Sequence, residues 1–173
     1  MMAKTHQLFG CMFGLISVFT CGIFQLNPQN IIQSIIYFIC ILFGSILPDL
    51  DHPKSKLGSK CILLSYPIYW VFGHRKATHS LLFVGIVAII SLIFSLLFGW
   101  SLYYPFGLTL GVFSHIIGDA LTNSGVPLLY PNKRKFKFSI TFQTGGVFEV
   151  FVALLITITN ILIVLAIIRL DLI

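Results

Sequence analysis

The chain has 173 residues, of which 57% are hydrophobic and only 9% are charged, and its mean hydropathy is +0.99. Because an average soluble domain is about 25% charged, this composition excludes an ordinary soluble protein. The apolar runs are continuous rather than alternating, which favours transmembrane helices over transmembrane strands. We therefore predict an all-α, polytopic membrane helical bundle that forms a single domain over residues 1–173.

The net charge of +6 raises the question of a nucleic-acid partner. No soluble folded module accompanies the basic residues, so we expect no nucleic-acid binding. Basic loops on the inner side of a membrane, facing anionic lipid headgroups, explain the charge better. The expected partner is the lipid bilayer.

Five long apolar runs predict five transmembrane helices, joined by polar turns and loops. Their approximate ranges are Leu8–Leu26, Ile31–Leu47, Leu81–Trp100, Tyr103–Leu121 and Val147–Ile168. A sixth stretch, Cys61–Gly73, is broken by Pro67 and is too short to cross about 30 Å of hydrocarbon. We expect it to be a re-entrant or interfacial segment. No cleavable signal peptide is expected, because the first run lacks a small-residue cleavage site and is followed by further spans.

The distribution of Lys and Arg predicts the orientation. With the N-terminus in the cytoplasm, ten of the eleven basic residues lie inside and only Arg169 lies outside. This bias satisfies the positive-inside rule, and it would be lost if Cys61–Gly73 crossed the membrane. The C-terminus is then expected outside.

The same topology brings most ionisable side chains to one depth at the inner face of the membrane. They are His6, Asp49, Asp51, His52, His74, His79, His115, Asp119 and Glu149. His115 and Asp119 are four residues apart, so they share one face of a helix. Histidine and carboxylate together are the usual ligands of zinc, manganese or iron in hydrolytic sites. The sequence predicts one or two divalent metal ions here, with zinc favoured over manganese or iron.

Each of these residues also has a simpler role when taken alone. Asp119 could pair with a nearby lysine, and Asp51 with His52 could form the turn before Pro53. His6 and Glu149 could be ordinary interfacial residues. Arg75 and its neighbour Lys76 could serve only as topology charges, although Arg also recognises phosphate with two parallel hydrogen bonds.

Three motifs carry a resemblance to a known family. They are Leu47-Pro-Asp-Leu-Asp-His-Pro53, His74-Arg-x-x-Thr-His-Ser80, and Ser114-His-x-x-x-Asp-x-x-Thr122 followed by Gly125-Val-Pro-Leu-Leu-Tyr-Pro131. In this order the chain resembles, over essentially its whole length, the LexA-regulated, membrane-bound, predicted metal-dependent hydrolases of prokaryotic cytoplasmic membranes. That family is in turn remotely similar to zinc-dependent phospholipase C. One departure is Lys76, which stands where many relatives have glycine.

The resemblance implies metal-binding roles for five residues, His6, Asp49, His79, His115 and Asp119, and extends less directly to Asp51, His52 and His74. We expect Asp51 or Glu149 to act as general base and Arg75 to stabilise charge on a phosphoester, which could be phospholipid-like. The main alternative is a divalent-metal or proton transporter that uses the same cluster, since intramembrane His and Asp often mark such pathways. A third possibility is a non-catalytic membrane scaffold.

Overall fold

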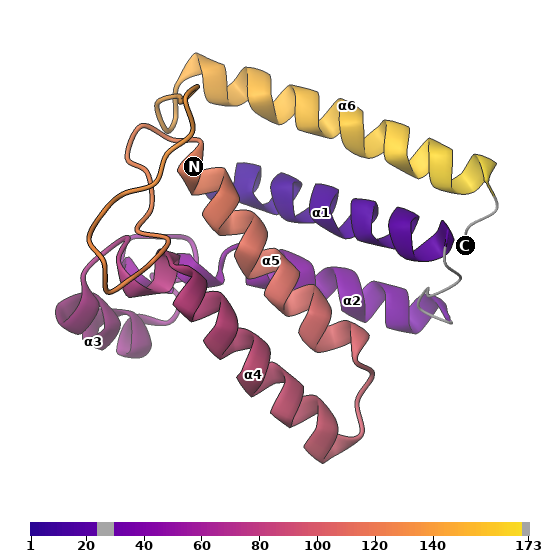
Figure 1. The fold of residues 1–173 in the computed structure, drawn as a ribbon, viewed down its shortest axis with the longest axis horizontal. Helices are drawn as coiled ribbons and strands as arrows, with labels where there is room; N and C mark the ends of the chain where they lie inside the picture. The colour runs from indigo at the N-terminus through magenta and orange to yellow at the C-terminus, as the bar shows by residue number, and fades with distance from the viewer. Residues whose placement is uncertain (24–29, 171–173) are drawn as a thin grey trace.

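The computed structural model describes residues 1–23 and 30–170, and within them the chain is all-helical, as predicted (Figure 1). The helices are α1 (Ala3–Ile23), α2 (Ile31–Gly44), α3 (Ile62–Phe72), α4 (Leu81–Phe98), α5 (Tyr103–Ala120) and α6 (Val147–Arg169). Two short 3-10 helices, η1 (Leu47–Asp51) and η2 (Ala77–His79), lie between α2 and α3 and directly before α4.

Three helical segments of the described chain are long and apolar enough to cross a membrane: Ile31–Asp51, which joins α2 and η1, then α4 and α6. The other two predicted spans form helices α1 and α5 but do not belong to this set, so the five-span topology stays a prediction. The expected end of the first span at Leu26 lies outside the described residues. So does the turn at Asn27–Asn30, except for Asn30, whose side chain caps α2 by accepting a hydrogen bond from the backbone N–H of Gln33.

The second predicted span ends earlier as an α-helix than its apolar sequence suggests. α2 stops at Gly44, and Pro48 explains why: a proline four residues further on would clash with the carbonyl of Gly44 and has no N–H to donate. The chain tightens instead into η1, which carries Asp49 and Asp51. The carbonyl of Ser45, just beyond the end of α2, is thereby left for a partner outside the helix.

α5 is the central helix of the bundle, because it packs against α1, α2 and α4, while α6 packs on α1 (Figure 1). The contact between α2 and α5 is close enough that only glycine fits at two positions. A Cβ atom added to Gly111 would collide with the carbonyl oxygen of Ile41, and one added to Gly44 would collide with that of Leu108. This close approach draws the C-terminal end of α5 toward η1.

α3 is a short apolar helix of 11 residues that contains Pro67. Its length of about 16 Å is half of what a membrane requires. Leu63 and Trp70 are 91% and 88% exposed. α3 packs on η1 at the same end of the bundle as the predicted inner face, which agrees with the expectation that Cys61–Gly73 does not cross the membrane.

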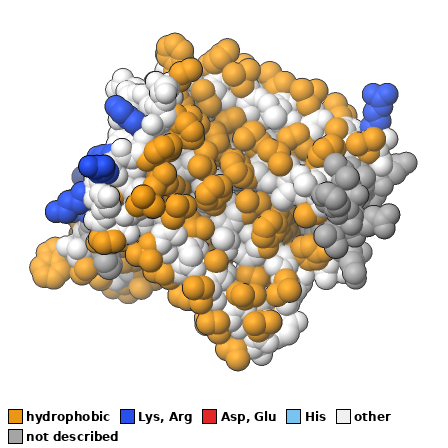
Figure 2. All heavy atoms as spheres, viewed as in Figure 1, with side chains coloured by type: hydrophobic (Ala, Val, Ile, Leu, Met, Phe, Trp, Pro, Cys, Tyr) orange, Lys and Arg blue, Asp and Glu red, His pale blue; other side chains and the backbone are white. Residues whose placement is uncertain are grey.

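Apolar side chains cover much of the visible face of the bundle, and the basic side chains gather at its ends (Figure 2). Lys4 near the start of α1, and the Lys and Arg residues between η1 and α4 and between α5 and α6, lie at one end of the bundle. Arg169 ends α6 at the opposite end. A wide exposed apolar belt between two polar ends is what a lipid bilayer covers.

The close contact between α2 and α5 generates a prediction. Gly111→Ala should lower the free energy of unfolding by about 1–3 kcal/mol, because the added methyl group meets backbone atoms that cannot yield. Gly85→Ala in α4 is the matched control, since a Cβ there meets nothing within 4 Å. Thermal unfolding of the two variants in detergent measures the difference, and equal midpoints would contradict the predicted close approach.

Candidate metal centre

The ionisable residues singled out in the sequence arrive at one end of the bundle from separate segments (Figure 1). His6 lies in the first turns of α1, and Glu149 lies in the first turn of α6. The remaining candidates come from η1 and the residue after it, from the segment that ends in η2, and from the last two turns of α5. The convergence expected from the charge pattern is therefore present in the structure.

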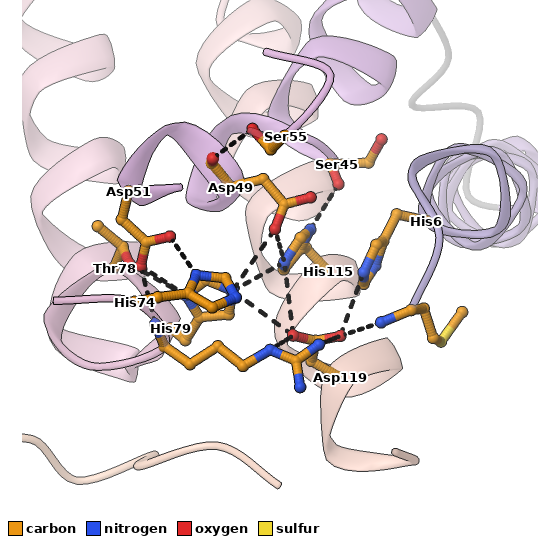
Figure 3. A network of polar contacts seen from close by, with 12 residues as sticks. His6, Ser45, Asp49, Asp51, Ser55, His74, Thr78, His79, His115 and Asp119 are labelled. Carbon is orange, nitrogen blue, oxygen red and sulfur yellow. Dashed lines mark hydrogen bonds and ion pairs between the residues drawn. The ribbon is translucent and has the colours of Figure 1, made fainter. Parts of the chain in front are cut away.

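Five of these side chains face one another closely enough to share a metal ion (Figure 3). One group of three potential ligands is His6, Asp49 and His115, and a second group is His79, His115 and Asp119. Within each group the ligand atoms all lie within 4.8 Å of one another. His115 belongs to both groups, so the five residues form a single cluster around it. These are the same five residues to which the resemblance assigned metal roles.

His115 is fixed by the end of α2. Its Nδ1 lies 2.7 Å from the carbonyl oxygen of Ser45, which can only accept, so Nδ1 carries the proton. The lone pair of Nε2 is then directed into the cluster. The interaction depends on the early end of α2, which leaves the carbonyl of Ser45 without a helical partner.

His79 is fixed in the same way by a carboxylate. Its Nδ1 lies 3.3 Å from Oδ2 of Asp51 and 3.0 Å from the hydroxyl of Thr78, which itself donates a hydrogen bond to Asp51. Nε2 of His79 is again the free nitrogen, and it lies 3.2 Å from Nε2 of His115. A carboxylate behind a histidine is the usual arrangement that orients a metal-binding imidazole and raises its basicity.

The spacing of the ligand atoms suits a small divalent ion. Two ligands, each roughly 2.0–2.2 Å from a tetrahedral zinc ion, lie about 3.3–3.6 Å apart. The Nε2 atoms of His79 and His115 are 3.2 Å apart. Oδ2 of Asp119 lies 3.5 Å from Nε2 of His79 and 4.0 Å from Nε2 of His115. These three side chains are completely buried. Two histidines and one carboxylate form a common catalytic zinc ligand set.

Asp119 carries a buried negative charge that several cations compensate. Arg75 contacts both carboxylate oxygens, with Nε 2.9 Å from Oδ2 and Nη2 3.0 Å from Oδ1. The ammonium group of Met1 lies 2.5 Å from Oδ1, and Nε2 of His6 lies 3.2 Å from the same oxygen. An unpaired carboxylate in this position would cost several kcal/mol.

Orphaned polar atoms concentrate at this cluster. Six buried side-chain nitrogen or oxygen atoms of the described residues make no contact with hydrogen-bond geometry, and four of them lie here: both ring nitrogens of His6, Nε of Arg75 and Oδ2 of Asp119. The contacts of Arg75 Nε and His6 Nε2 with Asp119 are therefore ion pairs and not aligned hydrogen bonds. Buried polar groups in native proteins are nearly always satisfied, so such a concentration calls for a further partner. A cation that accepts lone pairs fits Oδ2 of Asp119 and a nitrogen of His6.

His6 and Asp49 complete the cluster from two other sides. The ring of His6 stacks on that of His115, with centroids 3.7 Å apart and an interplanar angle of 11°. Oδ1 of Asp49 lies 3.9 Å from Nε2 of His79 and 3.8 Å from Nε2 of His115. The side chain of Asp49 is 17% exposed, whereas the other four ligand candidates are fully buried. Solvent therefore reaches the cluster on the side of η1.

Asp51 does not have the free carboxylate expected of a general base. Its Oδ1 accepts from Nδ1 of His74 at 2.7 Å, and its Oδ2 accepts from the backbone N–H of Arg75 at 3.0 Å as well as from Thr78. With His79 also beside it, every lone pair of this buried carboxylate faces a donor. Asp51 positions the loop and the ring of His79.

Glu149 likewise lies apart from the cluster. One of its carboxylate oxygens accepts from the backbone N–H of Met2, and the other accepts from that of Gly145, each at 2.6 Å. The side chain thus ties the start of α1 to the start of α6, where a carboxylate also interacts favourably with the helix dipole.

Three further predicted site residues make other contacts. Arg75 pairs with Asp119, and its φ of 55°, rare for a side-chain-bearing residue, turns its backbone N–H toward Asp51 at the same time. His74 contacts Asp51 and belongs to neither ligand group. His52 accepts a hydrogen bond from the backbone N–H of Lys54 and lies against His74, outside the cluster.

Sequence reasoning missed three groups that fix this geometry. The hydroxyl of Thr78 lies within the second motif, where its place beside His79 was the available signal. The carbonyl of Ser45 and the ammonium group of Met1 are backbone groups, so the identity of the residue does not indicate that they reach the cluster.

Comparison with known proteins agrees with the membrane assignment. Residues 1–170 match the sequence profile of a family described as YdjM inner membrane protein. Inner membrane protein YdjM of Escherichia coli is 41% identical over 120 residues, which cover 63% of this chain and 57% of that protein. YvsG of Bacillus subtilis is 38% identical over 111 residues, which cover 61% of this chain and 64% of that protein. The matches therefore span less than two thirds of these relatives. No solved structure matches the chain.

The different surroundings of the two aspartates in η1 generate a prediction for the metal-free protein. Asp51→Asn should lower the free energy of unfolding by about 2–4 kcal/mol, because an amide N–H₂ would face donors that now face a carboxylate. Asp49→Asn should change it by less than about 1 kcal/mol, since the contacts of that carboxylate to the histidines are 3.8 Å or longer. Thermal unfolding in the presence of a chelator compares them. Equal losses would refute the distinction between the two carboxylates.

Proposed function

Because the chain belongs to the YdjM family of inner membrane proteins and gathers five His and Asp side chains at one end of its bundle, we propose that it is a metal-dependent hydrolase of the inner membrane that cleaves a phosphoester. The observation that carries the proposal is the pair of free Nε2 atoms of His79 and His115 beside the buried carboxylate of Asp119. Both rings are oriented before any ion binds, which is typical of a built metal site.

A single ion, zinc in preference to manganese or iron, fits the cluster best. His79, His115 and Asp119 would hold it, with His6 and Asp49 adjoining. Nδ1 of His115 is occupied by the carbonyl of Ser45, so this histidine has one lone pair and cannot bridge two ions. When bound, a divalent ion polarises a phosphoryl oxygen and lowers the pKa of a water ligand toward about 7.

The residues around this centre have distinct roles in the proposed reaction. Asp49 is the cluster's only solvent-accessible carboxylate among the described residues and forms no side-chain hydrogen bond with a neighbour, so it replaces Asp51 and Glu149 as the candidate proton acceptor. Asp51 keeps His79 in the required tautomer. Arg75 holds Asp119 with two contacts and keeps positive charge beside the position of a phosphate.

Metal analysis tests the proposal most directly. Purified wild-type protein should contain about one equivalent of a divalent metal, and His115→Ala and Asp119→Ala should each reduce it at least about tenfold, as loss of a ligand or its support does. His52→Ala is the matched control, because His52 lies outside the cluster and should leave the metal content unchanged. Wild-type protein that binds no divalent metal would refute the proposal.

Activity is then measured on a soluble phosphodiester and on phospholipid in mixed micelles. We expect turnover that a chelator abolishes and that the same metal restores, with both ligand variants inactive and His52→Ala active. Metal flux into liposomes that the ligand variants abolish, without any hydrolysis, would instead support the transporter alternative.

We further propose that all five long helices cross the membrane and that the cluster faces the cytoplasm. The support is the concentration of Lys and Arg at the cluster end of the bundle, opposite Arg169. Alkaline phosphatase is active only outside the cytoplasm. Fused after Ile173 it should be active, and inserted after Lys133 it should be inactive. The reverse pattern would overturn this orientation.

A further inference from the structure

An apolar cavity of about 340 Å³ lies between α2, α4 and α5, on the lipid-facing side of the bundle. Its volume is in the lower part of the range of small-molecule pockets, about 300–1,000 Å³. It exists because α4 packs on α5 and η2, whereas α2 packs on α5 and α1, so α4 and α2 separate on one side of α5. None of the site residues described above lines it.

One face of α4 forms the longest wall of the cavity. The residues on this wall are Val87, Ile90, Ser91, Phe94 and Ser95, which repeat with the three-and-four spacing of a single helical face. From Val87 to Ser95 the wall extends about 12 Å along the helix. Ile90 and Phe94 are 51% and 49% exposed, so the cavity is open toward the surrounding lipid. An elongated molecule can enter it from the bilayer.

The chemistry of the walls selects an apolar occupant. The cavity wall contains two serines, and each already donates its hydroxyl proton to a backbone carbonyl. Ser91 donates to the carbonyl of Val87 at 2.6 Å, and Ser95 donates to that of Trp100 at 3.0 Å. No Lys, Arg, His, Asp or Glu lines the cavity. A hydrocarbon chain fits such walls, whereas a polar ligand would lose its hydrogen bonds there.

The cavity points toward the metal centre. Its wall includes Leu47, which is in η1 two residues before Asp49. It also includes Leu108 of α5, seven residues and about 10 Å along the helix from His115. The chain of a bilayer lipid that filled the cavity would therefore have its polar end on the side of η1. The cluster on that side includes the cationic Arg75, which is paired with Asp119.

We infer that this cavity binds an acyl chain of an anionic glycerophospholipid and so directs the phosphate of that lipid to the cluster. The role of the lipid as substrate rests on the proposed hydrolase function; binding of the chain does not. The substrate class would then be a phospholipid held by its tail and not a soluble phosphoester.

Trp100 lines the cavity, so its fluorescence reports the occupant. The chain has two tryptophans, and Trp70→Phe removes the one on α3, so that only Trp100, which is 55% exposed, emits. Chelator-treated Trp70→Phe protein in detergent is titrated with phosphatidylglycerol that carries brominated acyl chains. The fluorescence of Trp100 should fall to a plateau. Unbrominated lipid should reverse the quenching, and dihexanoyl phosphatidylglycerol should not, because its chains are too short.

Ser91→Phe in this background fills the cavity. It should raise the half-saturating lipid fraction about tenfold or more. Keeping only two methylene groups of the acyl chain out of the cavity would weaken binding by that factor. Ser91→Leu, a smaller change, should give an intermediate shift. It serves as a second test if Ser91→Phe does not fold. Leu92→Phe, on an exposed position of the same helix outside the cavity, should behave like the parent. Quenching that never saturates, or that Ser91→Phe leaves unchanged, would overturn the inference, as would competition by the short-chain lipid.

Hydrolysis by the metal-loaded protein, measured on both the soluble phosphodiester and phospholipid in mixed micelles, separates the two proposals. Saturable quenching without hydrolysis of either ester leaves the chain site standing and overturns the hydrolase. Hydrolysis of the soluble ester without saturable quenching supports the hydrolase and overturns the chain site.

Discussion

The carboxylate of Asp119 is fully buried at the end of the central helix, and the rest of this end of the bundle is arranged around its charge. A carboxylate removed from water is tolerated only when cations and donors surround it. Arg75, the ammonium group of Met1 and His6 meet that need from three different segments. The same groups bring α1 and the segment before α4 to α5. One electrostatic requirement thus determines which segments converge.

The packing of α2 on α5 supplies the second half of the site. Gly44 and Gly111 allow the two backbones to approach closely, and the early end of α2 leaves the carbonyl of Ser45 beside His115. His115 is therefore oriented by a backbone group that is available only because Pro48 ended the helix. Helix termination, helix packing and ligand orientation are consequences of one short stretch of sequence.

The two aspartates of η1 show how position separates residues of one type. Asp51 turns inward, where four donors from one loop surround it, and Asp49 faces the histidines with part of its surface in solvent. The first arrangement supports and orients, and the second leaves a carboxylate available for chemistry. The sequence Asp-Leu-Asp alone does not distinguish them, since the two aspartates are separated by one residue on the same short helix.

The sequence by itself determined the helical class, the helices other than their ends, and the end of the bundle at which the ionisable side chains meet. These features follow from local quantities: the length of apolar runs, the effect of proline on a helix, and the side on which basic loops lie. Only the tertiary structure decided that Glu149 ties two helix ends together, that Arg75 pairs with Asp119, and that His52 and His74 stay outside the cluster. Those outcomes depend on distances between segments far apart in the chain and on backbone groups such as the carbonyl of Ser45, neither of which residue identity encodes locally.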